Sequence, residues 1–260
     1  MPKISPDPVL ASDELSGERG KTSGSPPVFG LVITILHPAP SPLISFYETF
    51  CCHLKELLED AGVLDTHYLL YPPHTLHCTV ATVRPFKKAA LHHPERIISF
   101  WRSALERMEQ KPNWPESVEN STFDLCGPQV FDNGVGVFLF DDKSGAMNSL
   151  RRCLEEEMAC FQATLPEISD VNMEDVRVPN IIHSTVLRWR SSPAISTDQL
   201  QRLFNKAYEE ATVTHTTNAL SIGSVRLLRE SLPFMQKLTC CHEAPLPIGN
   251  KAQSQEGPAD

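Results

Sequence analysis

Hydrophobic and polar positions along the chain follow two periods. Short apolar segments rich in β-branched residues alternate with longer segments in which apolar residues recur every three or four positions. The first pattern is typical of β-strands, and the second of helices that bury one face. The predicted strands are 28–36, 76–83, 121–130, 134–140, 181–189, 220–228 and 234–240, and the predicted helices are 41–60, 94–109, 146–161 and 197–211.

The order of these predicted elements repeats. A strand–helix–strand–helix–strand unit begins at residue 28, and a second one begins at residue 134, about 105 residues later. A repeated supersecondary unit of this kind favours two related lobes within one α+β domain. We expect the two lobes to face each other across a cleft, which is a common place for a ligand.

The two ends of the chain differ in composition from the segment between them. Residues 1–27 and 243–260 are polar and rich in Pro, Ser and Gly, so they offer too little apolar surface to offset the entropy of ordering. We therefore expect disordered tails on either side of a folded domain at 28–242. Residues 1–27 lack the apolar core of a secretory signal, and no apolar run reaches the roughly 18 residues that span a bilayer. No membrane partner is expected.

Charge and cysteine content narrow the environment and the partners. The 23 Lys and Arg against 32 Asp and Glu give a net charge of −9, which argues against a long basic face that would hold duplex DNA. A nucleic-acid substrate should be short or held at one end. The eight cysteines lie mostly in apolar runs, which favours core cysteines in a reducing compartment, either cytoplasmic or nuclear.

Two matching tetrapeptides carry the candidate chemistry. The sequence HCTV at 77–80 and the sequence HSTV at 183–186 each lie in the second predicted strand of a repeat. Side chains alternate along a strand, so His77 and Thr79 should share one face, and so should His183 and Thr185. A third triplet, His215-Thr216-Thr217, lies in a polar run between a helix and a strand, and we interpret it as a chance match.

These residue types suit phosphodiester chemistry. Imidazole has an unperturbed pKa of roughly 6.5, and a hydroxyl can donate to a phosphoryl oxygen. Two such pairs around one phosphorus would supply a base for the attacking group, an acid for the leaving oxygen and two anchors. No metal or cofactor is required. The pairs Cys51-Cys52 and Cys240-Cys241 lack the spacing of a zinc site, so we expect no metal ligands there.

On these two motifs, the chain resembles the 2H phosphoesterase superfamily over about residues 28–242. The resemblance implies a bilobal, pseudo-symmetric α+β fold in which two antiparallel sheets face a central cleft with helices outside. It also implies metal-independent cleavage of RNA ends or cyclic nucleotides. Some members extend the second motif to His-x-Thr-x-x-Arg, which Arg188 fits. By alternation Arg188 would point away from His183 unless a bulge or the end of the strand re-aims it, so a solvated or ion-paired arginine is the alternative to a phosphate contact.

The sequence leaves the function open between classes. One hypothesis is a phosphodiesterase for 2′,3′-cyclic or 2′,5′-linked nucleotides or RNA ends, in which His77 and His183 act as acid and base. A second is a nucleotide-binding or RNA-end-binding module with little turnover, and a third is an RNA end-processing clamp. Tyr71 precedes the first motif and could stack on a base, whereas packing against Pro72 and Pro73 is the alternative. We expect a monomer.

Overall fold

The computed structural model describes residues 4–11, 28–37, 40–86, 93–115, 121–164, 171–215 and 219–246. Its longer elements lie close to the predicted ones. The strands are β1 (Gly30–Leu36), β2 (Tyr68–Leu70), β3 (His77–Arg84), β4 (Thr122–Val130), β5 (Gly136–Asp141), β6 (His183–Trp189), β7 (Ala219–Ser221), β8 (Ser224–Leu232) and β9 (Lys237–Pro245). The α-helices are α1 (Pro42–Asp60), α2 (Pro94–Met108), α3 (Ala146–Thr164) and α4 (Thr197–Thr214), and three short 3-10 turns lie at Asp65–His67, Pro73–Thr75 and Met173–Asp175.

All strand pairs in the described part of the chain are antiparallel, and they form two sheets. A four-stranded sheet has the order β3-β1-β8-β9, and a five-stranded sheet has the order β2-β6-β5-β4-β7. The predicted α+β class with two antiparallel sheets is therefore confirmed. The three-residue strand β2 was missed because it is too short for an alternation pattern, and the predicted strand 220–228 is interrupted at Ile222 and Gly223.

The two sequence repeats do not each form their own lobe. The first two long strands of each repeat pair with each other, β1 with β3 and β5 with β6. The third strand of each repeat then crosses to the other sheet, where β4 pairs with β5 and β8 pairs with β1. Each lobe thus contains strands from both halves. The pseudo-symmetry predicted from the sequence is present, but it relates two interleaved halves rather than two separate ones.

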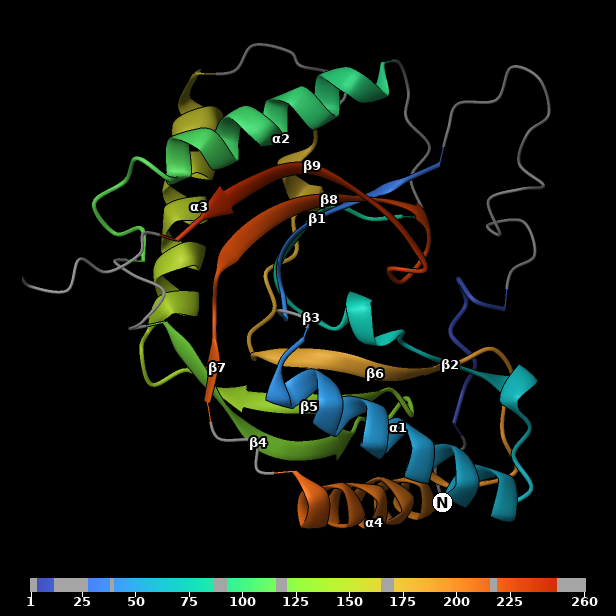
Figure 1. Cartoon of the computed structure of the whole chain (residues 1–260). Helices are drawn as coiled ribbons and strands as arrows, with labels where there is room; N and C mark the ends of the chain where they lie inside the picture. Colours follow the sequence, from blue (N-terminus) through green and yellow to red (C-terminus); the bar gives the residue numbers. More distant parts are fainter. Residues whose placement is uncertain are drawn as a thin grey trace, which may run out of the picture.

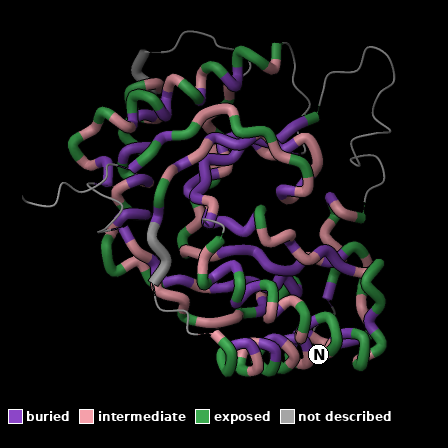
Figure 2. The backbone as a smooth tube through the Cα atoms, viewed as in Figure 1, coloured by how far each residue is buried: buried purple, intermediate pink, exposed green. Residues whose placement is uncertain are grey.

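The helices exchange in the same way and cover the outer faces of the sheets (Figure 1). Helix α1 of the first repeat lies beside α4 of the second, where Phe46 meets Tyr208 and Phe50 meets Phe204 in edge contacts. Both α1 rings also contact Phe138 of the five-stranded sheet. Helices α2 and α3 cover the four-stranded sheet in the same manner. Figure 2 shows buried positions concentrated on the strands and on the inner sides of the helices, so each core lies between a sheet and its helix pair.

The N-terminal residues 4–11 differ from the expected disordered tail. The Ile4 side chain is only 1% exposed, and Val9 is also buried. The Asp7 backbone N–H donates to the Trp189 carbonyl at the end of β6, and a Cβ at Gly134 would come within 2.5 Å of Ile4 Cγ2. Burial of two apolar side chains, Ile4 and Val9, packs this otherwise polar segment against the folded domain. Residues 1–3 and 12–27 lie outside the described residues.

The C-terminal boundary also differs from the expected one. Strand β9 runs to Pro245, and Leu246 is buried, so the fold continues past the predicted boundary at residue 242. Pairing with β8 satisfies the backbone of this polar stretch, and Ala244 packs into the core. The rest of the predicted C-terminal tail, 247–260, lies outside the described residues. No helix in the described part of the chain is long and apolar enough to cross a membrane.

Candidate functional site

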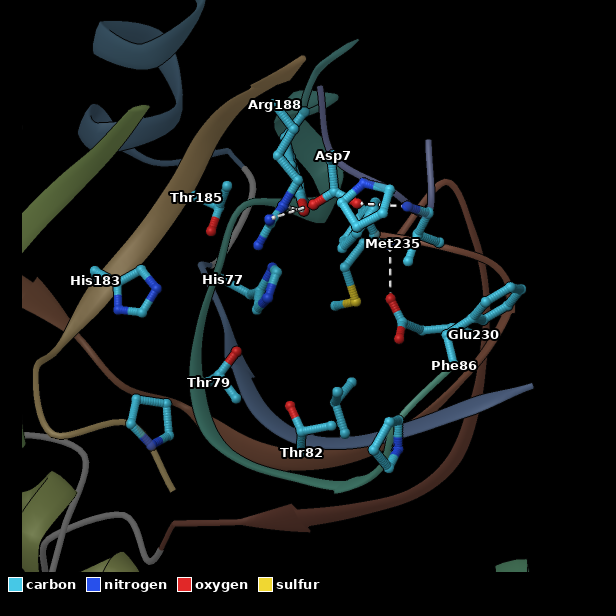
Figure 3. A pocket seen from close by; sticks show the side chains of 17 residues that line it. Asp7, His77, Thr79, Thr82, Phe86, His183, Thr185, Arg188, Glu230 and Met235 are labelled. Atoms are coloured by element: carbon cyan, nitrogen blue, oxygen red, sulfur yellow. Dashed lines mark hydrogen bonds and ion pairs between the residues drawn. The ribbon is translucent and has the colours of Figure 1, made fainter. Parts of the chain in front are cut away.

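A cavity of about 400 Å³ opens between the concave face of the four-stranded sheet and strand β6. It brings together all six residues singled out from the sequence, which lie on β3, on β6 and in the segment before the first motif (Figure 3). They are His77, Thr79, His183, Thr185, Arg188 and Tyr71. The two His-x-Thr strands therefore converge on one site, with each strand coming from a different repeat.

A matched irregularity in the two strands explains why Arg188 faces the cavity. In β6, Thr185 pairs with Val137 but Leu187 pairs with Gly136, so Val186 is an extra residue that forms a bulge. The bulge reverses the alternation beyond it, and Arg188 comes to the same face as His183 and Thr185. The orientation that strict alternation predicts for Arg188, away from His183, is therefore wrong, and the bulge is the reason.

Strand β3 carries the same irregularity at the same motif position. Ala81 pairs with Ile33 and Thr79 with Thr34, which leaves Val80 as the extra residue. As a result Thr82 faces the cavity beyond His77 and Thr79. Thr82 is the counterpart of Arg188, so the first motif extends to His-x-Thr-x-x-Thr. The spacing of Thr82 from His77 is visible in the sequence, but strict alternation would place Thr82 on the opposite face of the strand from His77.

His77 is held in one tautomer by the 3-10 turn that precedes its strand. Its Nδ1 lies 2.8 Å from the Thr75 carbonyl oxygen. A carbonyl can only accept, so Nδ1 carries a proton, and in the neutral ring Nε2 is left with the lone pair. Burial lowers the pKa of His77 to about 4, against the opposing effect of the Thr75 carbonyl, and His183 and Arg188 lower it further. His77 is thereby prepared to accept a proton at Nε2.

His183 is less buried than His77 and differs in its contacts. Burial lowers its pKa, followed by the charges of Arg188 and Arg151, while the Ile181 carbonyl raises it. Ile181 stands two residues before His183, as Thr75 stands before His77. However, Nδ1 of His183 is buried and has no partner with hydrogen-bond geometry among the described residues, and the Ile181 oxygen accepts from Arg151 Nη2. The ring of His183 is therefore less firmly fixed.

Arg188 brings a positive charge to the site, and three groups fix it. Its Nε donates to the Tyr71 hydroxyl at 3.2 Å, and its Nη1 pairs with Asp7 Oδ2 at 3.0 Å. The guanidinium carbon lies 4.3 Å from the centre of the Phe234 ring. Burial alone would lower the pKa of Arg188, but the Tyr71 hydroxyl and the Asp7 carboxylate outweigh it and raise the pKa, so the charge is retained.

Tyr71 contacts Arg188 through its hydroxyl, and little of its ring is exposed for stacking on a base. Its side chain is only 3% exposed, and its carbonyl accepts a 2.6 Å hydrogen bond from the Tyr47 hydroxyl. Burial raises its pKa to about 12, with Arg188 opposing this. Packing favours the interpretation of Tyr71 as a support for Arg188. The neighbouring His74 is exposed and does not line the cavity.

The opposite face of the two motif strands holds a buried polar cluster. Ser184 Oγ lies 2.7 Å from His37 Nε2 and 3.5 Å from Cys78 Sγ. Burial and the nearby His77 lower the pKa of His37 to about 3, and burial raises the pKa of Cys78 to about 12. Neither group faces the cavity. Cys78 is therefore a poor nucleophile despite its place inside the motif.

Several cavity residues could not be recognised from the sequence. Asp7, Pro8 and Val9 come from the presumed tail, and Glu230, Phe234 and Met235 come from β8 and the turn after it. Only the tertiary fold brings these segments to the motif strands. The one local signal was Thr82, through its spacing from Thr79.

The residues discounted from the sequence lie outside the cavity. His215 hydrogen-bonds Thr49 between α4 and α1. None of the eight cysteines forms a disulfide. The expectation of core cysteines was wrong for the four exposed ones, which are Cys52, Cys126, Cys160 and Cys240. The described residues contain no cluster of three or more His, Cys, Asp or Glu that could hold a metal ion.

Comparison with known proteins gives only distant likenesses. No family model matches the chain, and no curated protein matches it. Among solved structures, TT0787 of Thermus thermophilus is 14% identical, with a TM-score of 0.49 over 85% of this chain and 100% of that one. E. coli LigT complexed with 3′-AMP is 14% identical, with a TM-score of 0.45 over 86% and 99% of the two chains.

Usb1 of Kluyveromyces marxianus with uridine monophosphate is 13% identical, with a TM-score of 0.41 over 84% of this chain and 98% of that one. Likenesses at this level carry no argument about the chemistry of this chain. The fold and the site rest on the strand pairing and the cavity described above.

Proposed function

We propose that the protein is a phosphodiesterase that acts on 2′,3′-cyclic phosphates, 2′,5′-linked nucleotides or RNA ends. The observation that carries the proposal is the convergence of two equivalent His-x-Thr strands, one from each repeat, on a single cavity. A structural role would not require both histidines and both threonines to share one opening. The resemblance of the two motifs to the 2H phosphoesterases supports the same chemistry.

In the proposed reaction, neutral His77 accepts a proton at Nε2 from the attacking water or hydroxyl as the new P–O bond forms. The bond from phosphorus to the leaving oxygen breaks, and protonated His183 donates its proton to that oxygen. Thr79 and Thr185 donate hydrogen bonds to the non-bridging oxygens. Arg188 stabilises their charge. The histidines regain their starting protonation by exchange with water.

No step in this scheme uses a metal ion or cofactor. We therefore expect hydrolysis to survive EDTA, and loss of activity that a divalent ion restores would contradict this. A small substrate suits both the cavity of about 400 Å³ and the net charge of −9, since neither offers a long track for phosphates. Duplex DNA is not an expected substrate.

One observation favours a second function, a binding module with little turnover. The pKa values of both His77 and His183 are lowered, so neither ring of the free protein is well prepared to act as an acid near neutrality. An anionic substrate between the two rings would raise both values, because a neighbouring negative charge favours imidazolium. The phosphodiesterase proposal requires that the substrate do so.

A substrate panel separates the two functions. The purified protein would be assayed on 2′,3′-cyclic nucleotides, 2′,5′-linked dinucleotides and RNA with a cyclic-phosphate end, with and without EDTA, and binding of nucleoside monophosphates would be measured in parallel. Turnover that the His77→Ala and His183→Ala variants lose would support the enzyme. Binding without turnover on the whole panel would support the module.

A further inference from the structure

The cavity has a second end, across from His183 (Figure 3), that the proposed reaction does not use. Glu230 of β8 lies there, with Phe234 and Met235 of the following turn and Phe86 after β3. Figure 3 shows Glu230 and His183 on opposite sides of the cavity. The motif end offers imidazoles, hydroxyls and a guanidinium, whereas the residues named at this end are apolar apart from Glu230.

That carboxyl group is buried without a full set of partners. Glu230 is only 8% exposed, and its one hydrogen bond is from the Met235 backbone N–H to Oε1, at 2.8 Å. No donor to Oε2 is present among the described residues. Burial raises its pKa, and the Met235 N–H and Arg188 oppose this only in part. Oε2 is not among the fully buried side-chain atoms that lack a partner, and Glu230 lines the cavity, so this oxygen can accept a hydrogen bond from a ligand there.

The turn that follows Glu230 and strand β8 has an unusual backbone conformation. Phe234 and Met235 have φ values of 55° and 62°, a left-handed conformation that residues with a β-carbon rarely adopt. Asn and Gly are the usual residues at such consecutive positions of a hairpin turn. Here the turn places a phenyl ring and a thioether on the cavity wall. Backbone strain of this kind concentrates at ligand sites.

We infer that this end of the cavity binds the base of the substrate, and that Glu230 selects guanine by accepting its N1–H and N2–H donors. The inference rests on the proposed function and names the substrate class of the same site. A cavity of about 400 Å³ can accommodate one nucleotide, with its phosphate between the histidines and its base against the apolar wall. Phe86, Phe234 and Met235 supply the apolar contacts for a flat ring.

The choice of guanine follows from the hydrogen-bonding groups of the bases. An ionised carboxyl group can only accept. Guanine is the base whose pairing edge presents two adjacent donors. Adenine and cytosine place a ring acceptor beside their amino group, and uracil places carbonyls on both sides of its single N–H. Each of these alternatives would bring an acceptor close to a Glu230 oxygen or leave that oxygen unpaired.

The test compares bases at constant sugar and phosphate. We expect kcat/KM for guanosine 2′,3′-cyclic phosphate to exceed that for the adenosine analogue by about 10²-fold or more, because a buried group left unpaired by the wrong substrate discriminates strongly. Inosine lacks the N2 amino group and should fall between them. Glu230→Gln presents a donor and an acceptor, so the guanine-to-adenine ratio should fall at least about tenfold.

The control is Glu243→Gln, on the neighbouring strand β9, where Glu243 is exposed and paired with Arg226 and Ser224. This variant should keep the wild-type ratio. Melting curves of both variants exclude a folding defect, since Gln at 230 can still accept from the Met235 N–H. If the wild type cleaves all bases equally, or if Glu230→Gln keeps the wild-type ratio, the inference fails and the phosphodiesterase proposal stands.

The base selectivity can also be tested if the phosphodiesterase proposal fails. If no substrate on the panel is cleaved, the phosphodiesterase proposal fails, and the base selectivity is then measured by calorimetric binding of 5′-GMP against 5′-AMP. Preference for 5′-GMP that Glu230→Gln abolishes would support the inference in a binding module. Equal binding of the two nucleotides, or no binding, would overturn it.

Discussion

Cys78 Sγ lies 3.5 Å from Ser184 Oγ, and the two residues occupy the same position in the two His-x-Thr motifs. Equivalent residues of the two repeats are therefore in contact where β3 packs against β6. Because alternate side chains of a strand point to opposite faces, packing Cys78 against Ser184 turns the two histidines and two threonines to the other side, into the cavity. The buried contact is thus what aligns the two motifs.

The first prediction concerns this buried contact. Ser184→Ala removes the hydroxyl that lies 2.7 Å from His37 Nε2, while His37 Nδ1 already lacks a hydrogen-bond partner among the described residues. Loss of a partner from a buried polar group costs about 1–3 kcal/mol, so the free energy of unfolding in urea should fall by that amount. The exposed Ser45→Ala should change it by less than about 0.5 kcal/mol. Equal stability of both variants would contradict the role of the contact.

The second prediction concerns the motif histidines. His77→Ala and His183→Ala should each lower kcat by about 10² to 10⁴, since each removes a proton-transfer group, while circular dichroism shows an unchanged fold. The double variant should fall far short of the product of the two effects, because residues that act as a unit are not additive. His215→Ala serves as the matched control, because it has the same triplet but lies outside the cavity and should retain full activity.

The pH dependence gives a second view of the same pair. In the free protein, kcat/KM should rise through the lowered pKa of the base and fall through that of the acid. The pKa of His77 is about 4, and that of His183 is also lowered. The bell-shaped pH profile of kcat/KM should therefore have its maximum below the ordinary histidine pKa of roughly 6.5. Its two apparent values belong to the pair. Wild-type rates in both single variants would rule out the two-histidine mechanism.

The sequence predicted those parts of the site that depend on local periodicity. Strands β3 and β6, the faces of His77 and Thr79, and the repeat all follow from spacing along the chain. Arg188 was ambiguous because one bulge residue, Val186, reverses the face of everything beyond it, and no residue type marks such a bulge.

Residues contributed by distant segments were beyond local reasoning. Asp7 was assigned to a tail because two apolar side chains, Ile4 and Val9, do not raise the average composition of a polar segment. Glu230 follows a regular strand pattern, and its place on the cavity wall depends on the pairing of β8 with β1. The exchange of strands between the lobes could not be predicted either, because two repeats with the same order of elements fit separate and interleaved arrangements equally well.

The third prediction concerns the support of Arg188. Arg188→Lys keeps the charge but cannot bond Tyr71, Asp7 and a phosphate with one planar group, so kcat/KM should fall by about tenfold or more. Asp7→Asn should give a smaller loss with the same sign, because Nη1 keeps a neutral acceptor. Activity above wild type in Asp7→Asn would instead show that the carboxylate competes with the substrate phosphate.

Removal of residues 1–11 tests the docking of the whole N-terminal segment. It should lower the melting temperature, since Ile4 and Val9 are buried, whereas removal of 247–260 is predicted to leave the melting temperature unchanged. An unchanged melting temperature after removal of 1–11 would restore the view of this segment as a dispensable tail.

The last prediction is a loss of stability in mild acid. His37 and His77 are buried, with pKa values of about 3 and about 4, below the ordinary value of 6.5. The folded protein keeps both rings neutral, while the unfolded chain takes up protons below about pH 6.5. Their stabilising contribution is therefore fully present above that pH, and it is lost progressively as the pH falls through 6.5 towards 4 and then 3. Each ring contributes a slope of at most about 1.4 kcal/mol per pH unit.

The slope can be assigned to one ring by substitution. In His77→Asn, the pH dependence of the unfolding free energy between pH 6 and pH 4, measured in urea, should be shallower by about 1 kcal/mol per pH unit. His74→Asn, an exposed histidine three residues earlier in the chain, should retain the wild-type slope. Equal slopes in the wild type and His77→Asn would mean that the folded protein protonates His77 as readily as the unfolded chain, and the neutral state on which its role as a base depends would be lost with it.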